Sequence, residues 1–322
     1  MNLIDVHKQF ATDEQCLAYL EQMRWPSGVR CVTCGNDKLS KVTRDETSKG
    51  KNKRTTFYQC LEPTCRQQFS PTAGTIFHDS HLPLHKWFLA LALIVDAKKG
   101  VSAKQLQRHL GIGSYRTAWY LAHRIRKAME DASEGSLLSG TVEVDETYIG
   151  GKTKRRRHGT WGVRGRGTDK PIVIGIRQRQ GGVRFFHAAD VKSGTLAKYI
   201  KECVSTDVEM IVTDDFPIYD SAIPKAGHDI TKHKRIKHIS GVYVQGDIHT
   251  NTVESAFSLL KRGILGSFHK ISAKHLGRYL AEFEYRFNRR DDGDIFEQTM
   301  ARMAGVIPMP YAELIGKKDE AL

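Results

Sequence analysis

The sequence has no hydrophobic run long enough to cross a membrane. Its longest apolar run, WFLALALIV from Trp87 to Val95, has nine residues, whereas a transmembrane helix needs about 20. The first residues, MNLIDVHKQF, lack the basic and then apolar pattern of a secretory signal peptide. We therefore expect a cytoplasmic protein without a membrane partner.

Acidic residues are also in short supply. The chain has 322 residues, with 50 Lys and Arg against 36 Asp and Glu, which gives a formal net charge of +14. Such a balance favours a polyanionic partner, and nucleic acid is the leading candidate. The alternative is a surface that is merely basic and soluble.

Cysteine is scarce, and its spacing is informative. Four of the six cysteines form two close pairs, Cys31 with Cys34 and Cys60 with Cys65. Two such pairs can supply the four thiolates of a tetrahedral zinc site, which would be structural because it leaves no open coordination position. The polar segment between the pairs, with TTFYQC as a strand, is typical of a zinc ribbon. Four unconnected buried thiols are the alternative.

Helical patterns surround this segment. Thr12 and Gln15 have capping-box spacing, and Ser102 is expected to cap a helix that a GIGS turn separates from a second helix, beginning near Tyr115. This spacing is typical of a helix-turn-helix, although any two packed helices joined by a glycine turn look similar. Basic residues of the second helix are candidate DNA contacts: Arg116, Arg124 and Lys127.

From Gly140 the pattern changes to three strands, a helix and another strand, which predicts an α/β domain. Between the first two strands lies a loop, 151–170, that is too basic to bury a core. It is either a solvated loop or an arm that follows a phosphate backbone. Its candidate DNA contacts are Lys154, Arg155, Arg156, Arg157, Arg164 and Arg166.

Two aspartates occur in apolar strands, where charge is costly unless it is paired or binds a cation. Asp145 lies in VEVDET and Asp214 in MIVTDD. A salt bridge for Asp145 and a turn-forming role for Asp214 are the alternatives. Together with an acid on the helix HTNTVESAFSLLKRG, they are what two-metal phosphoryl transfer requires, because carboxylates hold paired Mg²⁺ ions. The polar face of that helix carries Asn251, Glu254, Ser258 and Lys261.

The segments VDETYIGG, VTDD and HTNTVESAFSLLKRGILGSFHKISAKHLGRYLAEFEYRFNRR resemble the insertion-sequence DDE transposases, in particular the group with an N-terminal zinc ribbon and an Asp-Asp-Asn-Glu-Lys catalytic pattern. The resemblance implies a ribonuclease-H-like catalytic domain with a mixed sheet. It also implies double-stranded DNA as substrate, strand cleavage followed by strand transfer, and two Mg²⁺ or Mn²⁺ ions besides a structural Zn²⁺. The implied catalytic residues are Asp145, Asp214, Asn251, Glu254 and Lys261.

Within this pattern, we expect Glu254 rather than Asn251 to be the third metal ligand, because a carboxylate binds Mg²⁺ more tightly than an amide. Asp215 is the main rival of Asp214, since only one of two neighbours in a strand can face the pocket. Lys261 is implied to contact the DNA end. We also expect at least a dimer on DNA and association with the bacterial nucleoid. Two other functions remain open, a nuclease or resolvase that only hydrolyses and a non-catalytic DNA-binding regulator.

The expected organisation is a helix and zinc ribbon (1–80), a helix-turn-helix module (81–135), the catalytic domain (136–295) and a C-terminal tail (296–322). The helix SAKHLGRYLAEFEYRFNRR carries Glu282 four residues from both Arg278 and Arg286. Surface ion pairs are the simpler interpretation of these residues, and DNA contact is the alternative.

Overall fold

The computed structural model describes residues 1–43, 56–130, 136–150, 168–236 and 246–316. The chain divides into two compact units. The first consists of Met1–Ala97, Val101–Met129 and Asp292–Leu322, and the second of Lys98–Gly100 and Glu130–Asp291. None of the helices in the described ranges has both the length and the apolarity that a bilayer-spanning segment requires.

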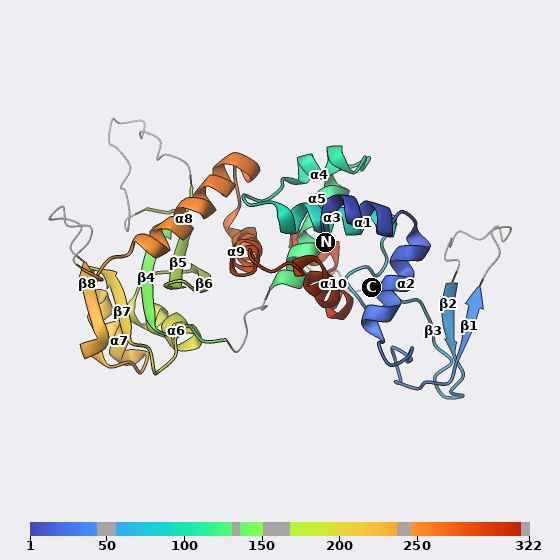
Figure 1. Ribbon diagram of the computed structural model, residues 1–322, viewed down its shortest axis with the longest axis horizontal. Helices are drawn as coiled ribbons and strands as arrows, with labels where there is room; N and C mark the ends of the chain where they lie inside the picture. The colour runs from blue at the N-terminus through green and yellow to red at the C-terminus, as the bar shows by residue number, and fades with distance from the viewer. Residues whose placement is uncertain (44–55, 131–135, 151–167, 237–245, 317–322) are drawn as a thin grey trace. The chain divides into compact units, whose positions relative to one another are not determined.

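The first unit is mainly helical (Figure 1). Its N-terminal helices begin where the sequence predicted: Thr12 and Gln15 form a capping box, and the Ser102 hydroxyl accepts from the Gln105 amide at 3.1 Å. The helices are α1 (Leu3–Gln9), α2 (Asp13–Arg24), α3 (Leu84–Asp96), α4 (Ala103–His109), α5 (Tyr115–Met129), α10 (Ile295–Gly305) and α11 (Tyr311–Ile315).

The segment expected as a C-terminal tail is instead part of this helical core. Helix α10 packs against α2, α3 and α5. The ring of Phe296 packs against the adjacent rings of Phe10 and Phe88, at centroid distances of 6.3 and 6.2 Å, and Arg302 Nε donates to the Ala128 carbonyl at 2.7 Å. The reason is visible in the sequence, because Phe296, Met300 and Met303 are spaced as one apolar helix face, and all three are fully buried.

A small antiparallel sheet completes the first unit. It contains β1 (Leu39–Thr43), β2 (Thr56–Cys60) and β3 (Gln68–Phe69), in that order. Tyr58 and Phe69 stack within it, but few apolar residues are buried around them. Such a small core needs another source of stability.

The second unit is built on a mixed sheet with strand order β6-β5-β4-β7-β8. Strand β4 is antiparallel to β5 and parallel to β7, while β5–β6 is antiparallel and β7–β8 is parallel. An α/β domain with a mixed sheet was expected. The strands are β4 (Thr141–Tyr148), β5 (Ile172–Gln178), β6 (Val183–Ala188), β7 (Met210–Asp214) and β8 (His233–Ile236).

Helices cover both faces of this sheet, and side-chain alternation separates the two cores. On one face, Val142, Val144 and Ile211 pack with α6 (Ser193–Cys203) and α7 (Ile218–Lys225). On the other, Val173 and Phe185 pack with α8 (Asn251–Gly263) and α9 (Ala273–Asn288). Figure 1 shows α8 crossing the sheet at β4 and β5. A 3₁₀ helix (Ile230–Lys232) precedes β8, and a π-helix (Ile264–Phe268) follows α8.

Helix α9 corrects the expectation of surface ion pairs. Glu282 and Arg286 do pair, at 3.0 Å, but they are buried, with 0% and 5% of their surfaces exposed. Arg278 pairs instead with Glu130 at 3.4 Å. The face of Glu282 and Arg286, which the sequence assigned to solvent, therefore packs against protein, and Glu282 Oε1 lies 3.2 Å from a Cβ built on Gly100.

Candidate active site and metal centre

The four paired cysteines meet at one end of the small sheet. Their sulfur atoms all lie within 4.8 Å of one another, with Cys31–Cys65 at 3.7 Å and Cys34–Cys60 at 3.6 Å. Zinc bonded to four sulfurs at about 2.3 Å places the sulfurs about 3.8 Å apart at the corners of a tetrahedron. The cluster fits structural Zn²⁺, as the spacing predicted.

Two tight turns hold these cysteines in place. Gly35 and Arg66, which follow Cys34 and Cys65, both have positive φ, 75° and 49°. Burial raises the pKa of the Cys31 thiol, but hydrogen bonds from the amides of Cys34 and Thr33 outweigh it and bring this pKa to about 7. A thiol with this pKa yields thiolate, the form that binds metal, at neutral pH.

In the second unit, the register of two parallel strands places Asp145 and Asp214 together. Glu143 of β4 lies opposite Val212 of β7. Because side chains alternate, Asp145 and Asp214, each two residues further along, share the sheet face that α8 covers. Both side chains are half-buried.

Helix α8 brings Glu254 to the same face. A glycine makes its close approach possible: Gly175 lies opposite Asp145, and a Cβ built on it would meet the Phe257 ring at 2.6 Å. Glu254 lies in the first turn of α8, and its Oε1 accepts from the Thr250 hydroxyl at 3.0 Å. Asn251 and Lys261 lie in the first and last turns of the same helix, and both are exposed.

The electrostatics of Asp145 reflect its burial and the acids near it. Burial raises the pKa of the Asp145 carboxyl well above its ordinary value, and the negative charges of Glu146, Asp214 and Glu254 raise it further. A carboxyl whose pKa is raised in this way is a candidate member of a functional site. This donor set, made only of oxygens, suits Mg²⁺.

The hydrogen bonds and ion pairs of the acids near Asp145 differ. Asp215 lies 3.8 Å from Arg235, and Glu146 accepts from the hydroxyl of the fully buried Tyr219 at 3.1 Å. Asp214 Oδ1 accepts from the Phe216 amide at 3.2 Å. The arrangement favours Asp214 over Asp215 as the second acid of the cluster.

Lys261 lines a cavity of about 850 Å³ that the end of β4, the residues just before β5 and the π-helix also line. Lys170, His269 and Lys270 also line this cavity. Three lysines around one opening provide a surface suited to phosphate groups.

The candidate DNA contacts of α5 differ in exposure. Arg116 is exposed, Lys127 is half-buried, and Arg124 is only 4% exposed. Arg124 donates to the His78 carbonyl at 2.7 Å, and its guanidinium lies over the rings of Trp87 and Tyr120. Arg124 therefore contributes to the helical core. The loop candidates Lys154, Arg155, Arg156, Arg157, Arg164 and Arg166 lie outside the described residues.

Sequence reasoning missed a group of residues around the start of α8, namely Glu143, Gly175, Arg177 and Arg179. Glu143 is completely buried on β4. Arg177 of β5 and Arg179, the residue after β5, bond to the segment that begins α8. Alternation in VEVDET places Glu143 on the face of Asp145, which was a usable signal. The arginines gave no such signal, because their partners are far away in the sequence.

Comparison with known proteins identifies the family. Residues 137–288 match the family described as "ISXO2-like transposase domain", and residues 11–68 match the "Transposase zinc-ribbon domain". The chain is also 30% identical, over 290 residues, to a protein of Halobacterium salinarum described as "Uncharacterized protein in transposable element ISH50". That match covers 87% of this chain and 92% of the relative. The chain therefore belongs to the insertion-sequence transposases that combine a zinc ribbon with an ISXO2-like transposase domain.

Proposed function

We propose that this transposase cuts DNA at the ends of its element and joins the freed 3′ ends to target DNA by two-metal-ion phosphoryl transfer. The observation that carries the proposal is the common location of Asp145, Asp214 and Glu254 on one sheet face, where their charges act on one another. Two bound Mg²⁺ or Mn²⁺ ions would activate the attacking oxygen and stabilise the leaving oxygen.

The residues of the chain have distinct parts in this reaction. Asp145, Asp214 and Glu254 hold the ions, and Asn251 orients Glu254, a water molecule or the DNA. Lys261 contacts a phosphate of the DNA end. In the first step water attacks the phosphodiester and leaves a 3′-hydroxyl; in the second, that hydroxyl loses its proton, attacks a target phosphodiester and displaces its 3′-oxygen. One phosphodiester replaces another, so no ATP is needed.

We further propose that the second unit is ribonuclease-H-like. Its support is the sheet order β6-β5-β4-β7-β8, with three antiparallel strands followed by two parallel ones. The first acid lies on the first strand of the unit and the second on its fourth. Open α/β sheets commonly place ligands at such strand ends.

The first unit is proposed to recognise the terminal inverted repeats. Helices α4 and α5 pack together, with a turn between His109 and Tyr115, as in a helix-turn-helix. The exposed Arg116 is its candidate contact, with the zinc ribbon beside it in sequence. We also propose that at least two copies act on one element, because two DNA ends must be joined.

The proposal is tested with substitutions of single acids. Asp145→Ala or Asp214→Ala should lower Mg²⁺-dependent nicking of an element-end duplex by at least about 10²-fold, the upper end of the effect of removing residues that only orient metal ligands. Binding of the uncut duplex, measured by gel shift, should stay at the wild-type level. Nicking at the wild-type rate by either variant would contradict the proposal.

The third ligand is tested separately. Glu254→Ala should abolish nicking, whereas Asn251→Ala should reduce it by a smaller factor, because an amide contributes less to Mg²⁺ binding. Full nicking by the Glu254→Ala protein would move the metal role to Asn251.

Strand transfer distinguishes a transposase mechanism from simple hydrolysis. A labelled, pre-nicked element end is incubated with circular target DNA and Mg²⁺. Joined products are expected, since water and a 3′-hydroxyl can use the same metal site. Nicking without any joined product would indicate an enzyme that only hydrolyses DNA.

A further inference from the structure

Glu143 lies two residues before Asp145 and is completely buried. Both of its carboxylate oxygens have partners. Oε1 accepts from Arg179 Nε at 2.8 Å and lies 3.3 Å from His249 Nδ1, while Oε2 accepts from the Val253 amide at 2.9 Å. A carboxylate that is engaged in this way is not available as a metal ligand.

The bond to Val253 caps helix α8 from another element. Thr250 occupies the N-cap position of α8, but its side chain makes no capping bond and donates to Glu254 instead. The first amides of a helix have no partner within the helix, and a negative charge at that end is favourable. Glu143 supplies both the acceptor and the charge.

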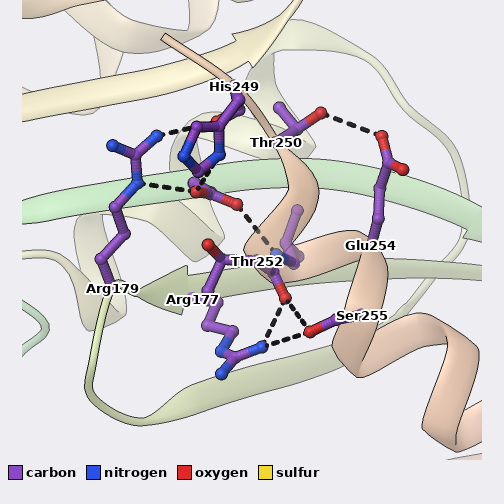
Figure 2. A network of polar contacts seen from close by, with 9 residues as sticks. Arg177, Arg179, His249, Thr250, Thr252, Glu254 and Ser255 are labelled. Atoms are coloured by element: carbon purple, nitrogen blue, oxygen red, sulfur yellow. Dashed lines mark hydrogen bonds and ion pairs between the residues drawn. The ribbon is translucent and has the colours of Figure 1, made fainter. Parts of the chain in front are cut away.

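Arg177 of β5 and Arg179, the residue after β5, hold the same segment by its carbonyl groups (Figure 2). Arg179 donates to the His249 carbonyl at 3.0 Å. Arg177 donates to the Thr252 carbonyl and, at 2.8 Å, to the Ser255 hydroxyl. The start of α8 is therefore bonded to two adjacent strands of the sheet.

We propose that the Glu143–Arg179 pair is a positioning device that sets Glu254 relative to Asp145. The inference rests on the proposed function, since it presumes that these two acids share metal ions. Its physical basis is that Glu143 and Asp145 lie on one face of β4, while Glu254 is one residue beyond the amide that Glu143 holds. A shift of α8 would thus move one acid of the cluster while the other stayed in place.

The test measures Mn²⁺ binding by the zinc-loaded, full-length protein without DNA. Electron paramagnetic resonance monitors the binding. Glu143→Gln keeps the size of the side chain but leaves one donor, Arg179 or Val253, facing an amide NH₂ group. We expect Mn²⁺ to bind about 10- to 100-fold more weakly, the usual effect of losing a residue that orients a metal ligand. Zinc content and element-end binding should not change.

Glu284→Gln is the matched control. Glu284 also accepts from a backbone amide, that of Phe185 at 3.0 Å, and pairs with an arginine, Arg184 at 3.7 Å, but it holds α9 rather than α8. It should lower the melting temperature while Mn²⁺ affinity stays at the wild-type level. Equal losses of Mn²⁺ affinity in the two variants would reduce the Glu143 pair to a general contribution to stability and overturn the inference.

Arg179→Lys gives a second variant in case Glu143→Gln does not fold. Lysine keeps the positive charge beside Glu143 but loses the bond to the His249 carbonyl, so Mn²⁺ affinity should fall several-fold in a folded protein. Unchanged affinity in folded Glu143→Gln or Arg179→Lys protein, with Mn²⁺ binding lost in Asp145→Ala, overturns the inference alone. Wild-type Mn²⁺ binding by Asp145→Ala would instead contradict the proposed function.

Discussion

Three acids stand within four positions of VEVDET, and the pleat of a single strand gives them different environments. Glu143 and Asp145 face α8, whereas Glu146 bonds to Tyr219 of α7. Of the two that face α8, Glu143 is saturated by hydrogen bonds, and Asp145 interacts with other acids. The residue type alone could not distinguish these roles. Strand alternation and the partners of each oxygen do so.

The same reasoning separates Asp214 from Asp215. Asp214→Asn should lower Mg²⁺-dependent nicking by about 10²-fold or more, because it removes a negative charge from the metal site. Asp215→Asn loses only the contact with Arg235, a partly exposed pair, and should nick within a few-fold of wild type. Both are measured by single-turnover nicking of an element-end duplex. The opposite order of effects would exchange their roles.

Two arginines of α5 are also expected to differ in role, one in DNA binding and the other in stability. Arg116→Gln should weaken DNA binding and lower the slope of log K against log salt by about 1, since each phosphate contact releases counterions. Arg124→Gln should leave that slope unchanged but destabilise the helical unit by about 1–3 kcal/mol, because Arg124 bonds to a carbonyl within the core. Fluorescence anisotropy at several salt concentrations and thermal melting check the two results. A fall in the salt slope for Arg124→Gln would indicate that Arg124 contacts DNA.

At the scale of secondary structure, periodic elements could be predicted from the sequence. The alternating apolar residues of β4, β5 and β7 and the apolar stripe of α8 lie where their patterns placed them. Strand β8 escaped prediction because HKRI is short and largely charged. Asp145 and Asp214 could be singled out as candidates because charge inside an apolar strand is costly. The bond of Glu143 to the Val253 amide could not be predicted, because the two residues are 110 positions apart in the sequence.

The packing of α8 on β5 gives a prediction about Gly175. Gly175→Ala should destabilise the second unit by about 1–3 kcal/mol, as overpacking does, and should reduce nicking, because the Phe257 ring must move. Gly277→Ala is the control, because Gly277 is exposed in α9 and a Cβ built on it has no neighbour within 4 Å. This substitution should raise the free energy of unfolding by about 0.5–1 kcal/mol. Denaturant unfolding and the nicking assay measure both. A neutral Gly175→Ala would mean that α8 tolerates displacement.

At the scale of the whole molecule, the zinc ribbon should depend on its metal. Cys31→Ser, or removal of zinc by a chelator, should unfold the small sheet, because its apolar core is minor. Zinc content should fall from one ion per chain to none, and element-end binding should weaken. Cys203→Ser is the control, because a serine hydroxyl can replace the Cys203 bond to the Tyr199 carbonyl, which is 3.1 Å long. Full zinc content in the Cys31→Ser protein would show that Cys31 is not a zinc ligand.

The first unit draws its helices from both sides of the second in sequence, and this order affects synthesis on the ribosome. The candidate acids Asp145, Asp214 and Glu254 emerge before residue 292, whereas Phe296 of α10, which packs with Phe10 and Phe88, emerges afterwards. The helical unit therefore cannot complete its core before α10 has been synthesised. A nascent chain that stops before α10 would carry the candidate acids without a finished helical unit. Under the proposed function, such a chain would lack a complete DNA-binding unit.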